Sequence, residues 1–433
     1  MSTVFFNSAL KIALNTVKRN VNSGDIVLVR DLNGRIRVLA PGHEKDLSGE
    51  HKTAFDKCSQ ELADALGAYG FPKDRAVLYA SALELGDDTF RDRQLIDEEG
   101  ALKVWLLDRQ IIGQDWMRAS LKRRTTNRRV TFFGIKGGVG RSTALVIWAW
   151  RLAKQGKKVL IFDLDLEFPG VSSTLLPDEY LPNYGIVDWF VEDGVGQANV
   201  IENALIASSP LARNLPGEIK IVPAFGQDKE NYLPKLARCY AEFSGNGHRA
   251  WGERLQQMVE TVEDKEMPDL VILDSRAGLH DIAAVSVTRM DADAFIFAAD
   301  SLQTWNAYAF LFKHWQQYHP KIKDFRRKLQ IVAAMIPETL RAEYLNRFKE
   351  RSWGLFREHL YDEAEAQTTD VFSFDVNDEE APHYPISVYW NRALQEFDPL
   401  QESGGVDEQN LETAMGKFMT EAERIVFTGE ENL

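Results

Sequence analysis

Short apolar runs alternate with helix-like stretches through the middle of the chain. The runs are rich in β-branched and aromatic residues, and the stretches between them carry apolar residues at three- and four-residue spacing. The runs cover residues 130–135, 159–163, 219–222, 270–274, 294–299 and 329–335. Such alternation predicts βαβ units and an α/β fold with a doubly wound, mostly parallel sheet. Ligands of these sheets bind at the carboxyl ends of the strands, so we expect the functional site there.

The pattern before this region predicts a small α+β domain over residues 1–115. Strand-like runs at 26–30 and 36–39 flank a turn, which predicts a β-hairpin, and helical spacing covers 50–68. The first 24 residues lack Asp and Glu and have an amphipathic pattern. A helix that packs on its own domain is favoured there over a transit peptide. The sequence does not reveal the role of this domain.

Three further segments follow the first domain. Residues 116–129 are rich in Lys and Arg, and a solvated basic linker is favoured over an anion or nucleic-acid site. The α/β domain is expected to occupy residues 130–340. The remaining residues, 341–433, form a C-terminal extension whose last helical pattern places Leu411 and Phe418 on one apolar face. Acidic residues around that face favour packing on the α/β domain over docking to a membrane.

Composition narrows the classes of function. The formal charge of −14 disfavours a general nucleic-acid or anionic-membrane surface, although a local basic patch stays open. The two cysteines, Cys58 and Cys239, are too few for a disulfide framework or a Cys-x-x-Cys metal site, so a reducing cytoplasm is expected. No run of 18 apolar residues occurs, which argues against a membrane-spanning helix.

A glycine-rich loop follows the first strand of the α/β region and precedes an apolar helix. Glycines let backbone N–H groups close around phosphate oxygens, and the N-terminus of the next helix adds about half a positive charge. The hydroxyl of Ser142 is suited to Mg²⁺ and that of Thr143 to a second phosphate. Strand, loop and helix agree, so a phosphate loop for ATP and Mg²⁺ is favoured over an ordinary turn. The loop consists of Lys136, Gly137, Gly138, Val139, Gly140, Arg141, Ser142 and Thr143.

Three carboxylates lie at the ends of predicted strands. Asp163 and Asp165 are two positions apart and face the same side, which predicts a functional pair or, alternatively, caps of the following loop. Asp274 ends an apolar run, as in a Walker B strand, and is expected to hold the hydration shell of Mg²⁺. Arg276 follows it. It is either an arginine finger that neutralises transition-state charge or a partner of Asp281 or Asp165 that orders the loop.

The loop and strand ends together resemble the deviant Walker A ATPases of the SIMIBI class, which include ParA and MinD. Their loop is Lys-Gly-Gly-x-Gly-Lys-Thr-Thr, and the resemblance covers residues 129–340. It implies that Lys136 reaches across a homodimer to the partner's nucleotide. It also implies that Asp165 positions or deprotonates the attacking water and that Asp163 holds Mg²⁺ through water. Pro337 lies where the group recognises the base.

Two arginines depart from the group's usual pattern. Arg141 stands where the group has its phosphate-binding lysine, and Arg276 stands where it usually has proline. The Gly-Gly-Val-Gly-Arg form is similar to the subgroup labelled KGGVGR-motif variant ATPases. A guanidinium is a wider planar fork than an ammonium, so this exchange is not conservative at a tight phosphate site. Slow hydrolysis is therefore expected.

Three functions are consistent with these features. The favoured one is a switch ATPase: ATP closes a homodimer, the closed state binds a protein partner through the N-terminal domain, and slow hydrolysis resets it. The alternative is a non-hydrolysing nucleotide sensor or scaffold that recruits an effector in bacterial conflict or stress signalling, which Arg141 and Arg276 make plausible. A ParA-like, DNA-associated partition ATPase is third, because nucleic acid is possible but not favoured.

Overall fold

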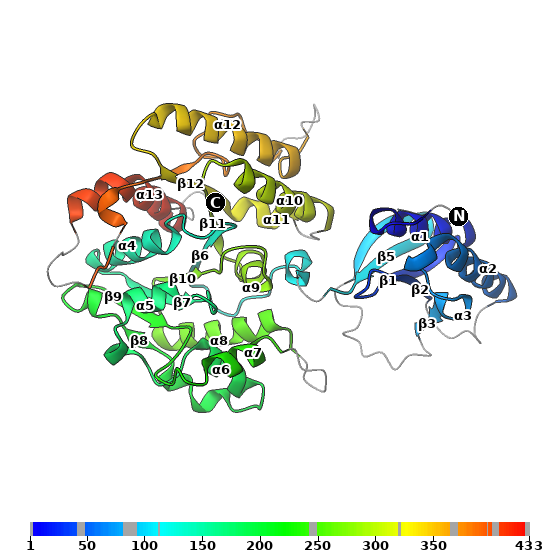
Figure 1. Cartoon of the computed structure of the whole chain (residues 1–433), viewed down its shortest axis with the longest axis horizontal. Coiled ribbons are helices and arrows are strands. Elements are labelled where there is room, and N and C mark those ends of the chain that lie inside the picture. The colour runs from blue at the N-terminus through cyan, green and yellow to red at the C-terminus, as the bar shows by residue number, and fades with distance from the viewer. Residues whose placement is uncertain are drawn as a thin grey trace. The chain divides into compact units, whose positions relative to one another are not determined.

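The alternating pattern folds into two units, Met1–Gln114 and Asp115–Leu433. The computed structural model, drawn in Figure 1, describes residues 3–40, 48–80, 93–110, 113–241, 249–318, 322–363, 371–395, 397–400 and 407–428. The sequence has an acidic stretch at 362–380, and part of it lies outside the described residues. Each unit has its own hydrophobic core and is considered by itself.

The first unit is built on a five-stranded mixed sheet in the order β3-β2-β1-β5-β4. The predicted hairpin is confirmed, because β1 and β2 pair antiparallel with Val27 opposite Leu39. The amphipathic first helix is also confirmed, and it buries Ala9, Ala13 and Val17 in the core of this unit. The elements are α1 (Phe6–Asn20), β1 (Ser23–Arg30), β2 (Ile36–Ala40), α2 (Gly49–Leu66), α3 (Lys73–Ala76), β3 (Val77–Tyr79), β4 (Gln94–Glu99) and β5 (Ala101–Asp108).

The second unit contains an eight-stranded sheet in the order β13-β12-β11-β6-β10-β7-β9-β8. All neighbouring strands run parallel except β8 and β9. The predicted α/β, doubly wound and mostly parallel fold is therefore confirmed. The strands are β6 (Arg128–Gly134), β7 (Lys158–Asp163), β8 (Ala207–Ser208), β9 (Glu218–Val222), β10 (Leu270–Asp274), β11 (Asp293–Ala298), β12 (Leu329–Ile336) and β13 (Ile386–Tyr389).

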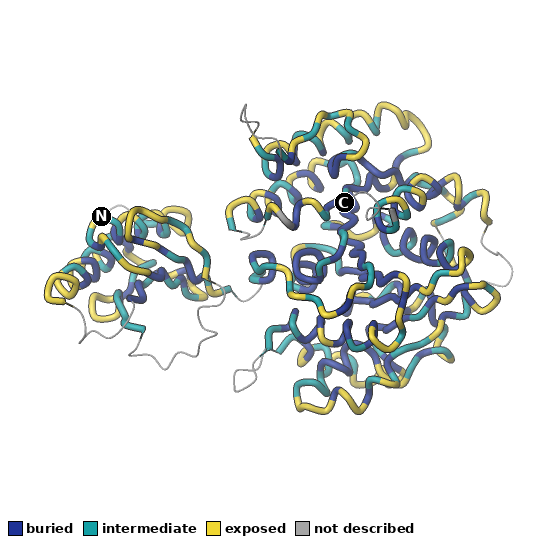
Figure 2. The backbone as a smooth tube through the Cα atoms, turned by 180° about the vertical axis from the view of Figure 1, so that it is seen from behind, coloured by how far each residue is buried: buried dark blue, intermediate teal, exposed yellow. Residues whose placement is uncertain are grey.

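Helices cover both faces of this sheet, as Figure 1 shows around β6, β7 and β10. Central strands such as β6 and β10 are almost entirely buried because helices cover both of their faces, and the buried backbone at the centre of this unit is dark blue in Figure 2. The helices are α4 (Arg141–Lys154), α5 (Gly170–Leu175), α6 (Ile186–Asp193), α7 (Tyr232–Cys239), α8 (Trp251–Glu266), α9 (Asp281–Ala284), α10 (Leu302–Tyr318), α11 (Ile322–Phe325), α12 (Arg341–His359) and α13 (Glu408–Thr428), with a π-turn at Val285–Arg289.

The C-terminal part contributes to the main core. The last helix, α13, packs Phe418 against Phe132, Trp148 and Phe297, as its predicted apolar face requires. Strand β13 joins the sheet as an edge strand beside β12. The sequence did not predict this strand, because four residues are too few to give a periodic signal. The sheet therefore continues beyond the point where the α/β domain was expected to end.

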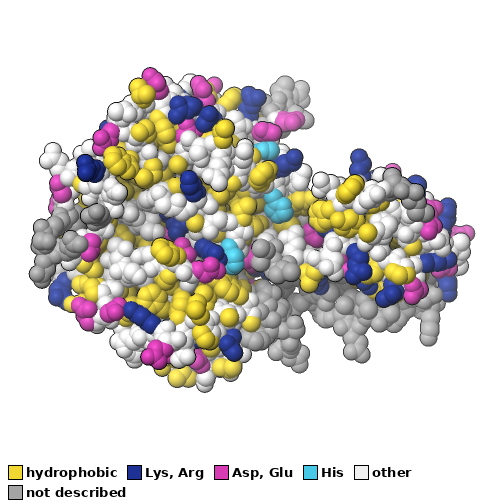
Figure 3. Space-filling model, in the orientation of Figure 1, with side chains coloured by type: hydrophobic (Ala, Val, Ile, Leu, Met, Phe, Trp, Pro, Cys, Tyr) yellow, Lys and Arg dark blue, Asp and Glu magenta, His cyan; other side chains and the backbone are white. Residues whose placement is uncertain are grey.

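The basic stretch at 116–129 is docked on the second unit. Arg129 and Glu263 form a completely buried ion pair, with Nε donating to Oε1 at 2.7 Å. Arg124 donates to Glu260 of the same helix, α8, at 2.6 Å. The expectation of a solvated linker is wrong for Arg129, which is buried against an acid far away in the sequence, whereas the Arg124 side chain remains largely exposed. Figure 3 likewise shows Lys and Arg interspersed with Asp and Glu on the visible face of this unit.

Within the described ranges, no helix is long and apolar enough to cross a membrane.

Candidate functional site

The glycine-rich loop joins β6 to α4 at the carboxyl edge of the sheet. Two of its glycines need left-handed backbone, Gly138 with φ 73° and Gly140 with φ 76°. A β-carbon on Gly137 or Gly138 would meet no atom within 4 Å, so this side of the loop is open. The loop thus has the room and the backbone geometry of a phosphate cradle at a helix N-terminus.

Lys136, the first residue of the loop, is exposed. Its ammonium forms no hydrogen bond or ion pair with the part of the chain that the structure describes. Its ammonium is therefore available to a group from outside this chain. Its predicted reach across a dimer stays a prediction.

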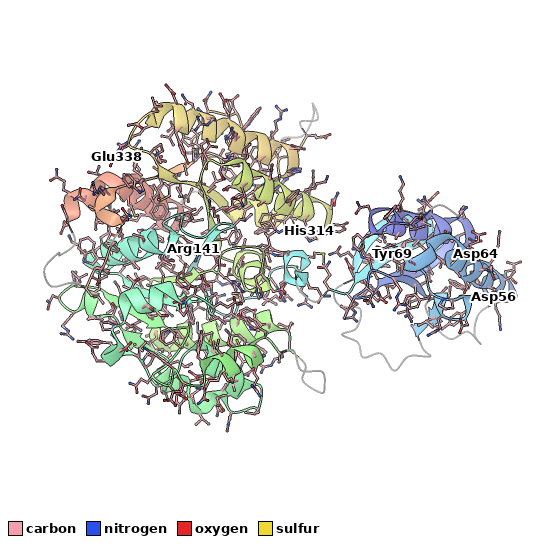
Figure 4. The ribbon with its side chains drawn as sticks, viewed as in Figure 1. Asp56, Asp64, Tyr69, Arg141, His314 and Glu338 are labelled. Atoms are coloured by element: carbon pink, nitrogen blue, oxygen red, sulfur yellow. The ribbon has the colours of Figure 1, made fainter. Side chains whose placement is uncertain are left out.

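Arg141 begins α4 and is nearly buried, and Figure 4 marks its place. Its Nε donates to Oδ1 of Asp274 at 3.0 Å, and its Nη2 lies 3.5 Å from Oδ2 of Asp165. The guanidinium thus joins the acid that ends β10 to the acid that follows β7. The sequence placed all three residues at one edge of the sheet, but it gave no sign that the arginine would bind the acids.

Ser142 and Asp274 meet directly. The Ser142 hydroxyl donates to Oδ2 of Asp274 at 3.0 Å. In a P-loop protein these two residue types hold Mg²⁺ and its water ligands. Burial raises the pKa of Asp274, while Arg141 and Ser142 act in the opposite direction. The carboxylate of Asp274 and the hydroxyl of Ser142 are oxygen donors beside an open loop. Oxygen donors of this kind are suited to a hydrated divalent cation.

Asp163 is fully buried and already bonded within the protein. Its Oδ2 accepts from the backbone N–H and the hydroxyl of Ser172 at 2.8 and 2.6 Å, and its Oδ1 accepts from the N–H of Asp165 at 3.2 Å. These bonds match the alternative that the acid caps the following loop and helix. Burial, together with the nearby Asp274 carboxylate, raises its pKa to about 7. A cation between the two acids would relieve that repulsion.

Asp165 is more accessible than Asp163. Burial raises its pKa, although Arg141 and Arg276 both act to lower it. A carboxylate with a raised pKa between two guanidiniums accepts protons more readily than an ordinary aspartate. The position suits contact with a water near the loop.

Arg276 pairs with a residue that the sequence analysis did not consider. Its Nη1 lies 2.5 Å from Oε1 of Glu167, whereas Asp281 and Asp165 were the expected partners. Glu167 follows β7 and Arg276 follows β10, and the two residues meet because these strands are neighbours in the sheet, which the sequence does not record. His280 lies close by, where its Nδ1 accepts from the N–H of Ile282 at 3.4 Å, so it serves as a helix cap.

The end of β12 also faces the loop. Pro337, the predicted base-recognition residue, is half-buried just after this strand. Figure 4 marks the neighbouring Glu338. The side chain that lies over the loop is Met335, whose sulfur is 3.8 Å from where a β-carbon of Gly140 would be. The sequence gave no indication of this contact.

Residues 127–302 match a protein-family model described as an AAA domain. The matched segment contains the glycine-rich loop and the strand ends that carry Asp163, Asp165 and Asp274. The family match therefore covers the elements that form the candidate site. Comparison with curated proteins finds no significant match.

Solved structures with some likeness to the fold include the following three. Cobyrinic acid a,c-diamide synthase from Mycobacterium smegmatis, with an ATP analogue and magnesium, is 16% identical with a TM-score of 0.38 over 52% of this chain and 83% of that chain. The pNOB8 ParA bound to nonspecific DNA is 15% identical with a TM-score of 0.45 over 71% and 99%. The ParA family ATPase from Chlorobium tepidum TLS is 15% identical with a TM-score of 0.40 over 68% and 99%. At such identities and TM-scores, no residue role or ligand carries over.

Proposed function

We propose that this chain is a Mg²⁺-dependent ATPase of the ParA/MinD kind that works as a switch. ATP binding closes a homodimer, and slow hydrolysis opens it again. The observation that carries the proposal is the bond between Ser142 and Asp274, at 3.0 Å, beside an open glycine loop and a helix N-terminus. A strand, a phosphate loop and a buried acid from the neighbouring strand are the parts that phosphoryl transfer from ATP requires.

Each residue of the loop has a task in this proposal. The backbone N–H groups of residues 137–143 bind phosphate oxygens, and the hydroxyl of Thr143 adds another donor. Mg²⁺ would be held by Ser142 and, through water, by Asp274 and Asp163, and it would neutralise charge that develops on the phosphates. Lys136 stays exposed until a second copy brings its nucleotide within reach.

Arg141 has to exchange partners during the cycle. In this structure it contacts Asp274 and Asp165, whereas a phosphate-binding role requires it to face the loop. The triphosphate carries more negative charge than the two acids, and bidentate guanidinium–phosphate bonds are strong. Transfer of Arg141 to the nucleotide would release Asp165 to orient the attacking water. This coupling supports slow hydrolysis.

Arg276 supplies a second positive charge at the site. It lies on the loop after β10 and pairs with Glu167 at 2.5 Å. We assign Arg276 a role in the transition state of hydrolysis. Its guanidinium would leave Glu167 and stabilise the transferring phosphoryl group. Glu167 would then restrain hydrolysis, since it competes for the same guanidinium.

A steady-state ATPase assay tests the proposed function. The intact chain with Mg²⁺ should hydrolyse ATP slowly, and Asp165→Ala should bind ATP but not hydrolyse it. Asp269→Ala is the matched control, because Asp269 precedes β10 and bonds the N–H of Lys158, away from the loop. Failure of the intact chain to bind Mg²⁺-ATP would contradict the proposal.

The non-hydrolysing sensor is the second candidate. The contact between Arg141 and Asp165 favours it, because a guanidinium held on the acid that should act on water blocks turnover. Tight ATP binding without turnover in the intact chain would select this candidate. Either function would use the first unit, Met1–Gln114, to engage a protein partner, and in neither is DNA the favoured ligand.

A further inference from the structure

Met335 has an unusual backbone for its residue type. It has φ 56°, in the left-handed region where side chains with a β-carbon are strained. It lies one residue before the end of β12, a strand whose other residues are mostly buried, and its side chain is 37% exposed. A strained residue in an otherwise regular strand calls for a compensating contact.

The pairing of β12 with β13 shifts in register at this position. Ala333 pairs with Ser387 and Ile336 pairs with Tyr389, so three steps along β12 match two steps along β13. The extra residue bends the strand and changes the direction of the neighbouring side chain. Met335 therefore leaves the regular alternation of β12 at the edge of the sheet where the glycine-rich loop lies.

The redirected side chain lies against the loop. A β-carbon on Gly140 would come 3.8 Å from the Met335 sulfur, and it would meet no other described atom within 4 Å apart from its chain neighbours. Gly140 itself has φ 76° and directly precedes α4, which begins with Arg141 and Ser142. Two left-handed residues from separate elements thus pack on each other beside the first turn of the helix.

We propose that Met335 is a positioning residue for the phosphate loop. Its flexible, polarisable thioether covers Gly140 and holds the loop's last glycine in the backbone conformation that aims the N–H groups of α4 at a phosphate. The proposal rests on the proposed nucleotide function and names a residue outside the loop that maintains it. A small shift of Gly140 would misplace Arg141 and Ser142 together, which is how distant substitutions weaken preorganised sites.

Binding of ATP and of inorganic tripolyphosphate tests this assignment. Both ligands are titrated with Mg²⁺ into the full chain by calorimetry, because tripolyphosphate has no base and reports on the phosphate and Mg²⁺ site alone. Met335→Ala and Met335→Gly should weaken both ligands by about fivefold. Met335→Leu, which keeps a similar apolar volume, should restore affinity. Glycine relieves the strain, so Met335→Gly should lose affinity with no fall in the thermal midpoint of the ligand-free chain.

Met267 provides the matched control. It also has a left-handed backbone, with φ 46°, but it caps the C-terminus of α8 and is 72% exposed. Met267→Ala and Met267→Gly should bind both ligands like the unaltered chain. A loss for ATP alone would overturn the proposal in favour of a base contact, and unchanged binding by both Met335 variants would overturn it outright. An unaltered chain that binds neither ligand would instead refute the proposed function.

Discussion

Nε of Arg141 donates a hydrogen bond to Oδ1 of Asp274 across 3.0 Å. The residue that replaces the usual lysine of the phosphate loop is thus bound to the acid expected to hold Mg²⁺. Arginine retains the positive charge, but its planar fork can bind two acids at once, as it does here with Asp165. The site therefore has an internal competitor for the nucleotide.

Substitution of Arg141 should separate its two tasks. Arg141→Ala should weaken ATP binding about tenfold, since a charge-assisted bond to phosphate is lost. Arg141→Lys should retain most of the affinity and raise kcat, because lysine lacks the planar fork that reaches Asp274 and Asp165 together here. The control is Arg151→Ala on the same helix, where the arginine pairs with Glu412 and Glu423 at the surface. Unchanged ATP affinity in Arg141→Ala would exclude the phosphate role.

The pair between Arg276 and Glu167 predicts opposite effects on turnover. Arg276→Ala should lower kcat at least about tenfold with little change in ATP affinity, as expected for a group that acts in the transition state. Glu167→Gln should raise kcat about threefold, because it frees the guanidinium. Single-turnover and steady-state kinetics of the two variants measure both changes in kcat. Equal loss of activity in the two variants would mean that the pair only orders the loop.

Because Arg129 and Glu263 form a buried pair, substitutions at these two positions should have strongly non-additive effects on the free energy of unfolding. Arg129→Met leaves the carboxylate of Glu263 buried without its guanidinium, which should cost about 3–5 kcal/mol of unfolding free energy. The double variant Arg129→Met with Glu263→Leu should lose far less, because no buried charge remains. Urea unfolding of the single and double variants measures the coupling. Additive losses would contradict this account.

Asp293 predicts a stability that depends on pH. Burial raises its pKa from 3.8 to about 6, so between those values the folded chain holds a proton that the unfolded chain has lost. Its contribution to stability therefore falls as pH rises from about 4 to about 6. Asp293→Asn should raise the thermal midpoint above pH 6 and make no difference near pH 4. If Asp293→Asn changed the thermal midpoint equally at pH 4 and pH 8, the effect would not arise from the raised pKa of Asp293.

Much of the α/β unit could be predicted from the sequence. Six predicted strands correspond to β6, β7, β9, β10, β11 and β12, because strands buried on both faces are continuous apolar runs. The loop, Asp163, Asp165 and Asp274 meet at one edge, since parallel strands end there together. These placements follow from local patterns that need no knowledge of distant contacts.

The contacts between distant residues could not be predicted in this way. The pairing of Arg276 with Glu167, and of Arg129 with Glu263, depends on which elements become neighbours in space. Met335 was missed for another reason: a bulge depends on how β12 and β13 match in register, and no single strand records that match. The short edge strand β13 lacked enough residues for a periodic signal.

The mass of the chain in solution tests the central claim most directly. Light scattering gives the mass of the Asp165→Ala variant, in which the ATP state should persist. The mass is measured in three conditions: with Mg²⁺-ATP, with Mg²⁺-ADP and without nucleotide. The account predicts twice the 49.2 kDa of one chain with ATP and a single chain in the other two conditions. A single-chain mass with saturating ATP would contradict the ATP-switched dimer.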